Sequence, residues 1–332
     1  MHTELPEILR CPRTGQRLVL EQPEYRLEHV QSGWLVSEDG AHRYAIRDFI
    51  PRFMPESNYA DSFGMQWNKF RRTQLDSHSG HPISASRFWK ATGWRPEDIA
   101  GHWVLDAGCG AGRFAEVALQ AGAKVVALDY SSAVDACFAN LRHHPNLHVV
   151  QGDIYALPFR SGFFPYVYSL GVLQHTPDVA KAFAALPPMV AEGGALCVDY
   201  YQKSWKSLLL PKYWLRPMTK RMPKARLFAI LERLVPKALP VSRALGCVPL
   251  LGIWLKRIVP VANYVGILPL TENQHLEWSL LDTFDMLSPE FDAPQSPETV
   301  TRWLHSAGLE QIEVFIAGHL VGRGRMPHAT RH

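Results

Sequence analysis

The chain has 332 residues, of which 47% are hydrophobic and 20% charged, and its formal net charge is +4. This composition excludes a disordered or collagen-like chain and is typical of a globular protein with a buried core. No apolar run approaches the roughly 20 residues that cross a bilayer, and residues 2–10 are too polar to resemble a signal peptide. The five cysteines lie apart without paired spacing, which indicates a reducing compartment. We therefore expect a cytoplasmic protein.

Residues 1–56 alternate short apolar runs with glycine and proline. The runs RLVL, GWLV and HRYAI are separated by turn signals at Ser32-Gly33 and Asp39-Gly40, which predicts a small β-rich unit. Cys11 begins the sequence CPRTG, but a single thiol cannot build a four-ligand zinc site. The sequence therefore predicts no metal in this unit.

Strands and helices alternate from Trp103 onward. WVLDAGCG predicts a strand that runs into glycines, RFAEVALQAG a helix, and KVVALDYS and NLHVVQGD two further strands. YVYSLGV and GALCVDYY add two more strands, and the pattern resumes near the C-terminus with a helix capped by Ser296 and two closing strands. Such alternation predicts a Rossmann-like, doubly wound α/β sheet. We assign residues 57–202 and 271–324 to this domain.

A glycine-rich loop follows the first of these strands. Gly108, Gly110 and Gly112 stand where the strand turns into a helix, and Asp106 comes directly before them. Glycines let a ligand approach the backbone at the carboxyl end of such a sheet. A carboxylate beside them would repel the pyrophosphate of a dinucleotide, but it suits the sulfonium and ammonium of S-adenosylmethionine.

Two further acids end the next two predicted strands. Asp129 is placed to accept hydrogen bonds from ribose hydroxyls, and Asp153 from an adenine amino group while Ile154 packs on the ring. Each acid alone could be a helix cap. Three acids at the ends of three successive strands favour a nucleoside site.

The motifs VLDAGCGAGRFAEVAL, ALDYS, QGDIYALPF and SLGVLQHTPD together resemble those of class I S-adenosylmethionine-dependent methyltransferases. The resemblance implies a seven-stranded sheet whose last strand is antiparallel. The cofactor-binding residues that it implies are Asp106, Gly108, Gly110, Gly112, Asp129, Tyr130, Asp153, Ile154 and Leu170. The N-terminal unit is similar to the zinc-ribbon-like module of many bacterial methyltransferases, in a form without metal ligands.

The expected acceptor side begins after the fourth strand. His175 could act as a general base, or it could only shape its loop. The other acceptor-side candidates are Trp67, Gln174, Tyr200 and Tyr201. An acidic group lacks partner histidines and metal-ligand spacing, so we expect a turn there that leads to the last helix; its members are Asp282, Asp285, Glu290 and Asp292.

Residues 203–270 interrupt the domain. Between Lys203 and Arg257 there are thirteen Lys and Arg against one acid, Glu232. The sequence KARLFAILERLVPKAL places Leu227, Leu231 and Leu234 largely on one helical face. The insert is expected to be a helical cap over the acceptor site, with a homodimer contact or an anionic membrane surface as alternatives.

The leading hypothesis is therefore methyl transfer from S-adenosylmethionine to a small-molecule, glycan-type or lipid-linked acceptor. We expect the protein to be cytoplasmic, with peripheral contact to the inner membrane surface as an option. A non-catalytic cofactor-binding or scaffold protein is an alternative, and an RNA methyltransferase is a weaker one, since the insert's aromatics do not form a stacking platform. An NAD-dependent oxidoreductase is disfavoured by Asp106.

Overall fold

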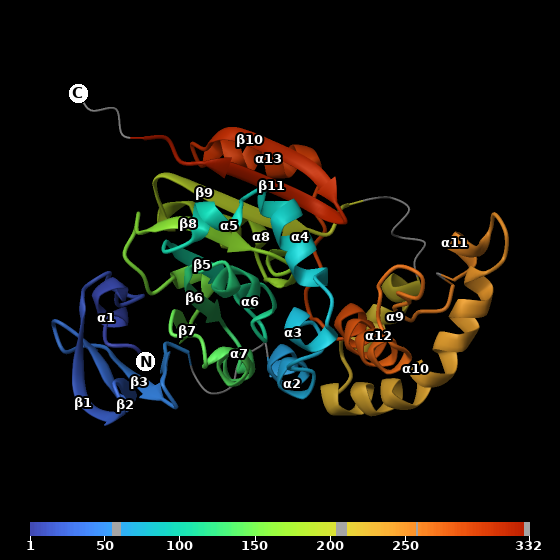
Figure 1. Ribbon diagram of the computed structural model, residues 1–332, viewed down its shortest axis with the longest axis horizontal. Helices are drawn as coiled ribbons and strands as arrows, with labels where there is room; N and C mark the ends of the chain where they lie inside the picture. Colours follow the sequence, from blue (N-terminus) through green and yellow to red (C-terminus); the bar gives the residue numbers. More distant parts are fainter. Residues whose placement is uncertain (55–60, 204–210, 257, 329–332) are drawn as a thin grey trace.

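The computed structural model describes residues 1–54, 61–203, 211–256 and 258–328. Its centre is one mixed sheet with the strand order β1-β2-β3-β4-β7-β6-β5-β8-β9-β11-β10. Helices cover both faces of the sheet, and a helical lobe projects from one end (Figure 1).

Seven strands of this sheet form the predicted domain. They are β5 (Trp103–Ala107), β6 (Lys124–Asp129), β7 (Leu147–Gln151), β8 (Phe164–Ser169), β9 (Val190–Tyr200), β10 (Glu310–Ala317) and β11 (His319–Arg325). Strands β5 to β9 pair in parallel, whereas β11 is antiparallel to both β9 and β10. The predicted seven-stranded sheet with an antiparallel last strand is confirmed.

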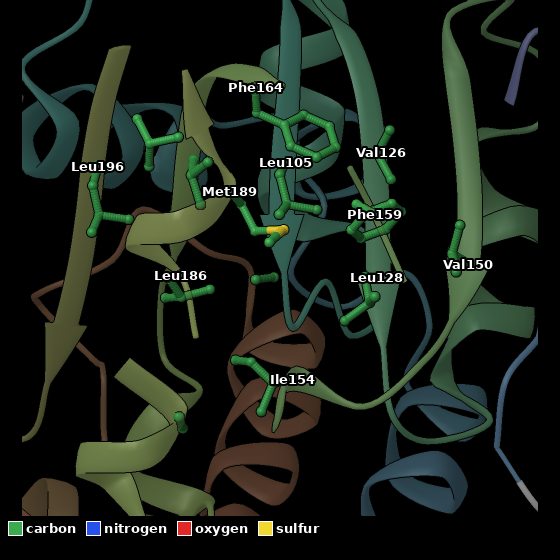
Figure 2. Packing of buried hydrophobic residues seen from close by; sticks show 14 of the residues in the cluster. Leu105, Val126, Leu128, Val150, Ile154, Phe159, Phe164, Leu186, Met189 and Leu196 are labelled. Carbon is green, nitrogen blue, oxygen red and sulfur yellow. The ribbon is translucent and has the colours of Figure 1, made fainter. Parts of the chain in front are cut away.

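Both faces of the parallel strands are buried, because alternate residues enter two different hydrophobic clusters. Leu105 packs in one cluster with Val126 and Leu196, while Val104 packs in the other. Figure 2 shows the first cluster, in which Leu105 of β5 lies between Val126 of β6 and Leu196 of β9, with Met189 beside Leu105. The helices that complete these layers are α4 (Ile83–Thr92), α5 (Pro96–Ile99), α6 (Arg113–Gln120), α7 (Ala133–Leu141), α8 (Val179–Ala184) and α13 (Pro297–Ser306).

The N-terminal unit is β-rich, as predicted, and it extends the main sheet. Its elements are α1 (Leu5–Ile8), β1 (Leu18–Arg26), β2 (His29–Ser37), β3 (Arg43–Arg47) and β4 (Ile50–Arg52). Strand β4 pairs in parallel with β7 at Arg52 and Gln151, and the Arg52 guanidinium donates to the Gln151 side chain at 3.0 Å. The turn expected at Ser32-Gly33 is wrong, because both residues lie within β2 and the chain reverses at Leu27-Glu28.

Cys11 is buried in this unit, and its Sγ lies 3.2 Å from the hydroxyl of Tyr44. Across the described ranges, no three His, Cys, Asp or Glu side chains gather in an arrangement that could hold a metal ion. Tyr44 and the neighbouring Phe53 pack their rings 4.8 Å apart beside the thiol. Apolar and aromatic contacts thus organise the region around Cys11.

The insert is helical, as expected, with α9 (Pro211–Thr219), α10 (Lys224–Gly246) and α11 (Gly252–Leu255). One face of α10 packs on α12 (Glu272–Leu287) and on Phe70, which follows α2 (Asp61–Lys69). The residues of this cluster are Phe70, Leu227, Phe228, Leu231, Val235, Leu281, Phe284 and Leu287. Leu234 departs from the predicted apolar face and is 54% exposed.

The turn expected at the acidic group is wrong for Asp282 and Asp285, which lie on α12, whereas Glu290 and Asp292 lie in the non-helical connection to α13. Thr271 caps α12 by accepting from the backbone N–H of Gln274, whose side chain accepts from the N–H of Thr271 in return. The carboxylates of Asp282 and Asp285 therefore project from a regular helix that packs beside α3 (Asp76–Ser79), where the Gln274 side chain donates to the Ser79 carbonyl at 3.2 Å (Figure 1).

Candidate active site

A cavity of about 660 Å³ lies at the carboxyl ends of β5, β6 and β8. Open α/β sheets bind ligands at this edge, and cavities for drug-sized ligands measure roughly 300–1,000 Å³. Part of its lining comes from the loop after β5 and from the ends of β6 and β8. The rest comes from α2, α4, α12, the insert and the turn between β10 and β11. One cavity thus joins the predicted cofactor loop to the predicted acceptor side.

The three loop glycines all have positive φ, which side chains other than glycine rarely adopt. Gly108 and Gly110 line the cavity. A Cβ on Gly108 would lie 2.4 Å from the side chain of Val172, and one on Gly110 would lie 3.3 Å from Trp67. Gly112 does not line the cavity; it begins α6 where a Cβ would meet Leu141 at 2.6 Å. Two glycines therefore shape the cavity, and the third allows helix packing.

Gly108→Ala should destabilise the protein by about 1–3 kcal/mol through the strained backbone at φ +100°, with a further loss from overlap with Val172. The matched control is Gly162→Ala, at φ +64° with no atom within 4 Å of the added Cβ. Urea unfolding of both variants separates the two contributions. Equal losses would show that Val172 moves aside freely.

Asp129 ends β6 and lines the cavity from a half-buried position. Its Oδ1 accepts from the backbone N–H and the hydroxyl of Ser131, and its Oδ2 accepts from the backbone N–H of Gly110 at 2.9 Å. Burial raises the pKa of Asp129 above its ordinary value. Since a carboxylate oxygen accepts about two hydrogen bonds, Oδ2 retains capacity for one ligand hydroxyl.

The adenine-side candidates divide into two groups. Tyr130, Ile154 and Leu170 line the cavity, and Ile154 and Leu170 are buried. Asp153 does not line it: this half-buried carboxylate caps the 3₁₀ turn Ile154–Ala156 by accepting from the Tyr155 N–H at 2.9 Å. The structure therefore brings the apolar adenine-side residues to the cavity without the carboxylate of Asp153.

Asp106 lies beneath the glycine loop rather than in the cavity. It is 2% exposed, and its Oδ2 has no hydrogen-bond partner within the described part of the chain. Burial, reinforced by the charge of Asp129, raises the pKa of Asp106 to about 8. Any influence of Asp106 on a ligand would therefore be exerted through the loop that covers it.

Asp106→Asn should reduce the loss of stability that accompanies rising pH. Because the pKa of Asp106 is raised from 3.8 to about 8, the folded protein holds this proton more tightly than the unfolded chain, so ionisation between these values destabilises the fold. Asparagine has no proton to lose. Melting temperatures at pH 5 and pH 8 should differ less in the variant than in the wild type, and equal differences would show that Asp106 does not titrate in this range.

The acceptor side gathers around the ring of Tyr201, which lines the cavity. The His175 ring packs 5.5 Å from it edge-on, and the His319 ring, from the start of β11, lies 5.4 Å from it. The Tyr201 hydroxyl donates to Asp285 at 3.4 Å, and Lys212 Nζ lies 5.0 Å from the ring centroid. The structure thus brings His175, Tyr201 and His319 together on one wall of the cavity.

The two histidines have opposite tautomers. His175 Nδ1 lies 3.1 Å from the carbonyl oxygen of Phe291, which can only accept, so Nδ1 carries the proton and Nε2 the lone pair. His319 Nδ1 lies 3.4 Å from a guanidinium nitrogen of Arg87, which can only donate, so His319 carries its proton on Nε2. Burial lowers the pKa of His319 to about 4, which keeps it neutral near pH 7. The hydrogen bond of each ring thus fixes which of its nitrogens carries the proton in the neutral form.

Arg87 and Asp199 support this wall from behind. Arg87 donates to Asp199 at 2.6 Å, and Asp199 also accepts from the backbone N–H of Gly171 at 2.5 Å. Burial alone would raise the pKa of Asp199, but the Arg87 guanidinium lowers it below its usual range. Truncating either partner would leave a buried charge unpaired, which is strongly destabilising.

The remaining acceptor-side candidates lie differently. Trp67 lines the cavity. Tyr200 is fully buried in the core, 5.9 Å from the Trp303 ring, and does not line the cavity. Gln174 is also fully buried outside the lining, and its side-chain amide has no hydrogen-bond partner among the residues described. Of the two tyrosines, only Tyr201 reaches the cavity.

Several polar residues complete the lining, and of these Arg113 and Asp282 were not predicted from the sequence as site residues. Gln66 is 1% exposed, and neither polar atom of its side chain has a partner in the described ranges, although it lines the cavity. Arg113 donates to Ser84 at 2.9 Å and to Gln74 at 3.0 Å, and burial lowers its pKa to about 10. Asp282 accepts from Gln74 and from the Tyr264 hydroxyl, and burial raises its pKa to about 6.

Residues 105–198 match the family described as "Methyltransferase domain". A ubiquinone biosynthesis O-methyltransferase from Albidiferax ferrireducens is 33% identical over 116 residues, which cover 34% of this chain and 46% of the relative. A trans-aconitate 2-methyltransferase from Deinococcus radiodurans is 40% identical over 98 residues, covering 29% and 36%. Among solved structures, magnesium protoporphyrin IX methyltransferase from Synechocystis with bound S-adenosylhomocysteine has a TM-score of 0.42 at 15% identity, covering 81% of this chain and 96% of that one.

The match spans about half of the length of the ubiquinone-pathway relatives. The family match, residues 105–198, includes the glycine loop, Asp129, Ile154, Leu170 and His175. The insert and the N-terminal unit lie outside it. The chain therefore carries a methyltransferase domain of the S-adenosylmethionine-dependent class.

Proposed function

We propose that the protein transfers a methyl group from S-adenosylmethionine to a small-molecule acceptor held beside His175 and Tyr201. The observation that supports this most is the single cavity, which the loop glycines and Asp129 line together with His175 and Tyr201. A nucleoside cofactor and an acceptor can therefore meet within one enclosure, as transfer between two bound molecules requires.

The residues present fit the cofactor. Asp129 Oδ2 can accept from a ribose hydroxyl, and Ile154 and Leu170 offer apolar surface for the adenine ring. Gln66 brings an amide without a protein partner, as far as the chain is described, which suits a carboxylate or ammonium group. A dinucleotide fits less well, because the carboxylate of Asp129 accepts from the Gly110 N–H that a pyrophosphate would need.

When bound, S-adenosylmethionine supplies a methyl group that its sulfonium already activates. The protein's own contribution is then to align the acceptor, exclude water and accept a proton where the acceptor has one to lose. His175 Nε2 would accept that proton, while the Nδ1 hydrogen bond to the Phe291 carbonyl fixes the ring. His319 would donate its Nε2–H to the acceptor, since Arg87 holds its Nδ1.

The relatives' names include quinone-pathway, malonyl-carrier-protein and trans-aconitate methyltransferases, so similar domains serve different acceptors. For this chain we propose a small molecule with a hydroxyl or carboxyl group, with a glycan-type or lipid-linked acceptor as the more specific version. Aromatic and cationic groups support an anionic or aromatic acceptor: Tyr201, Tyr264, Trp278, Lys212 and Arg113 all line the cavity.

Calorimetry with S-adenosylmethionine, S-adenosylhomocysteine and NAD tests the cofactor. Micromolar binding of the first two and none of NAD is expected, and the reverse would refute the proposal. Methyl-tritiated cofactor should then be offered with 3,4-dihydroxybenzoate, trans-aconitate and a glycolipid extract. Cofactor binding without transfer to any of these, or to a metabolite extract, would favour the non-catalytic alternative.

A further inference from the structure

The helical insert exposes apolar side chains at the end farthest from the sheet, where α11 lies (Figure 1). Leu250 is 98% exposed and Ile258 63% exposed. We call the following residues the tip: Val248, Leu250, Leu251, Trp254 and Ile258. Large apolar groups gathered on a surface in this way mark an interaction site more often than single exposed ones do.

Leu250 also has a positive φ of 64°, a conformation that is unfavourable for a leucine. Asparagine or glycine would fit this backbone better and would make the tip less apolar. Leu27, at the turn between β1 and β2, is a second leucine with these properties, at φ 55° and 91% exposed, but it stands on the N-terminal unit. Leu27 is therefore a matched control for the tip.

The outer face of α10 leads toward the tip and mixes cations with aliphatic residues. Along this face, at helical spacing, lie Arg226, Ile230, Arg233, Leu234, Lys237 and Val241, all exposed. The opposite face is the one that packs on α12. Helix α10 is thus amphipathic in an unusual way: its inner face is apolar, and its outer face is both basic and apolar.

The positive charge of this face is not neutralised by the insert itself. Its one acid, Glu232, pairs with Lys69 of α2 at 2.7 Å. Two other cations of the insert are paired with acids and do not belong to this face: Lys212 lies 3.5 Å from Asp292, and Arg243 lies 3.1 Å from Glu272. The outer face of α10 therefore presents a basic surface next to the apolar tip.

We propose that the tip and the outer face of α10 bind the surface of an anionic lipid bilayer. The apolar tip would enter the boundary between headgroups and acyl chains, and Arg226, Arg233 and Lys237 would lie near lipid phosphates. No helix in the described ranges is long and apolar enough to cross a membrane, and this binding mode requires none. A second copy of the chain fits the surface less well, because the two basic outer faces of α10 would repel each other.

The insert that carries this surface also supplies Lys212, Tyr264 and Leu268 to the cavity lining. A docked insert would therefore connect the cavity-bearing domain to the lipid surface. The proposal concerns binding alone, however, and does not rest on the proposed methyl transfer.

Flotation of the full-length protein tests the proposal. Phosphatidylcholine vesicles with admixed phosphatidylglycerol should carry the protein, pure phosphatidylcholine vesicles should not, and salt should reverse the binding. Arg233→Gln with Lys237→Gln should weaken partitioning roughly thirtyfold, at about 1 kcal/mol for each cation near the surface. Arg13→Gln with Arg17→Gln, exposed on the N-terminal unit, should leave it unchanged.

Leu250→Asn with Ile258→Asn should also abolish most of the binding, whereas Leu27→Asn should not. The two leucine substitutions place asparagine at similar positive φ, so they share any backbone effect. Absence of flotation with anionic vesicles at low salt, or equal losses in tip and control variants, would overturn the proposal. A change in oligomeric mass rather than flotation would assign the surface to a second copy, and salt-sensitive RNA binding without flotation would assign it to nucleic acid; either would overturn it too.

Discussion

Asp129→Ala is expected to weaken S-adenosylmethionine binding roughly 10- to 150-fold, which corresponds to about 1.5–3 kcal/mol for a lost charge-assisted hydrogen bond. The carboxylate acts in two ways: Oδ2 can accept from a ligand hydroxyl, and it also holds the Gly110 N–H in place. Calorimetry with S-adenosylhomocysteine measures the loss without any need for an acceptor.

Asp153→Ala is the matched control, because Asp153 follows the neighbouring strand β7 but does not line the cavity. It should change cofactor affinity much less than Asp129→Ala, although it removes the cap of a short 3₁₀ turn. If the two variants lost equal affinity, Asp153 would contact the adenine, as the motif resemblance implies. If neither lost affinity, the cofactor would bind elsewhere.

The cofactor side of the cavity could be predicted because its residues are local in sequence. A strand, a glycine turn and a helix bring Gly108 and Gly110 to the sheet edge, and parallel strands bring Asp129 to the same edge. The exceptions have physical reasons as well. Gly112 allows α6 to pack closely against Leu141, and the Asp153 carboxylate accepts from the nearby backbone N–H of Tyr155 instead of facing the cavity.

The acceptor side was harder to predict, because its residues come from distant parts of the chain. Arg87, Asp282 and His319 meet only after α4, α12 and the last hairpin have packed. No local pattern marks such residues as neighbours. The helix start at Thr271 was visible in TENQ, however, and would have placed Asp282 on a helix rather than in a turn.

Two errors come from strand geometry. Successive strand residues face opposite sides, so Tyr200 enters the core with Leu196 and Val198, and Tyr201 turns to the cavity. At Ser32-Gly33 the glycine serves a close approach rather than a turn. A Cβ on Gly33 would lie 3.1 Å from Pro23, opposite an irregularity in β1.

His175→Asn should lower turnover by roughly a hundredfold to ten-thousandfold if His175 is the general base. The amide nitrogen of asparagine can occupy the place of Nδ1 and still donate to the Phe291 carbonyl, so the loop should keep its shape. Asparagine has no basic nitrogen in the place of Nε2. The variant therefore removes the proton acceptor while it preserves the structural hydrogen bond.

The comparison with His175→Ala and His319→Asn distinguishes a general base from a residue that only positions its loop. Turnover is measured with the acceptor that is fastest in the panel, and S-adenosylhomocysteine affinity is measured beside it. A base predicts that asparagine and alanine at position 175 are equally slow, with cofactor affinity preserved. It also predicts that His319→Asn lowers turnover only about tenfold, which corresponds to the loss of one hydrogen bond.

Near-normal turnover in His175→Asn but not in His175→Ala would instead show that the hydrogen bond to Phe291, not a basic nitrogen, is what turnover requires. His175 would then position the loop, and the acceptor would lose its proton to water or have none to lose.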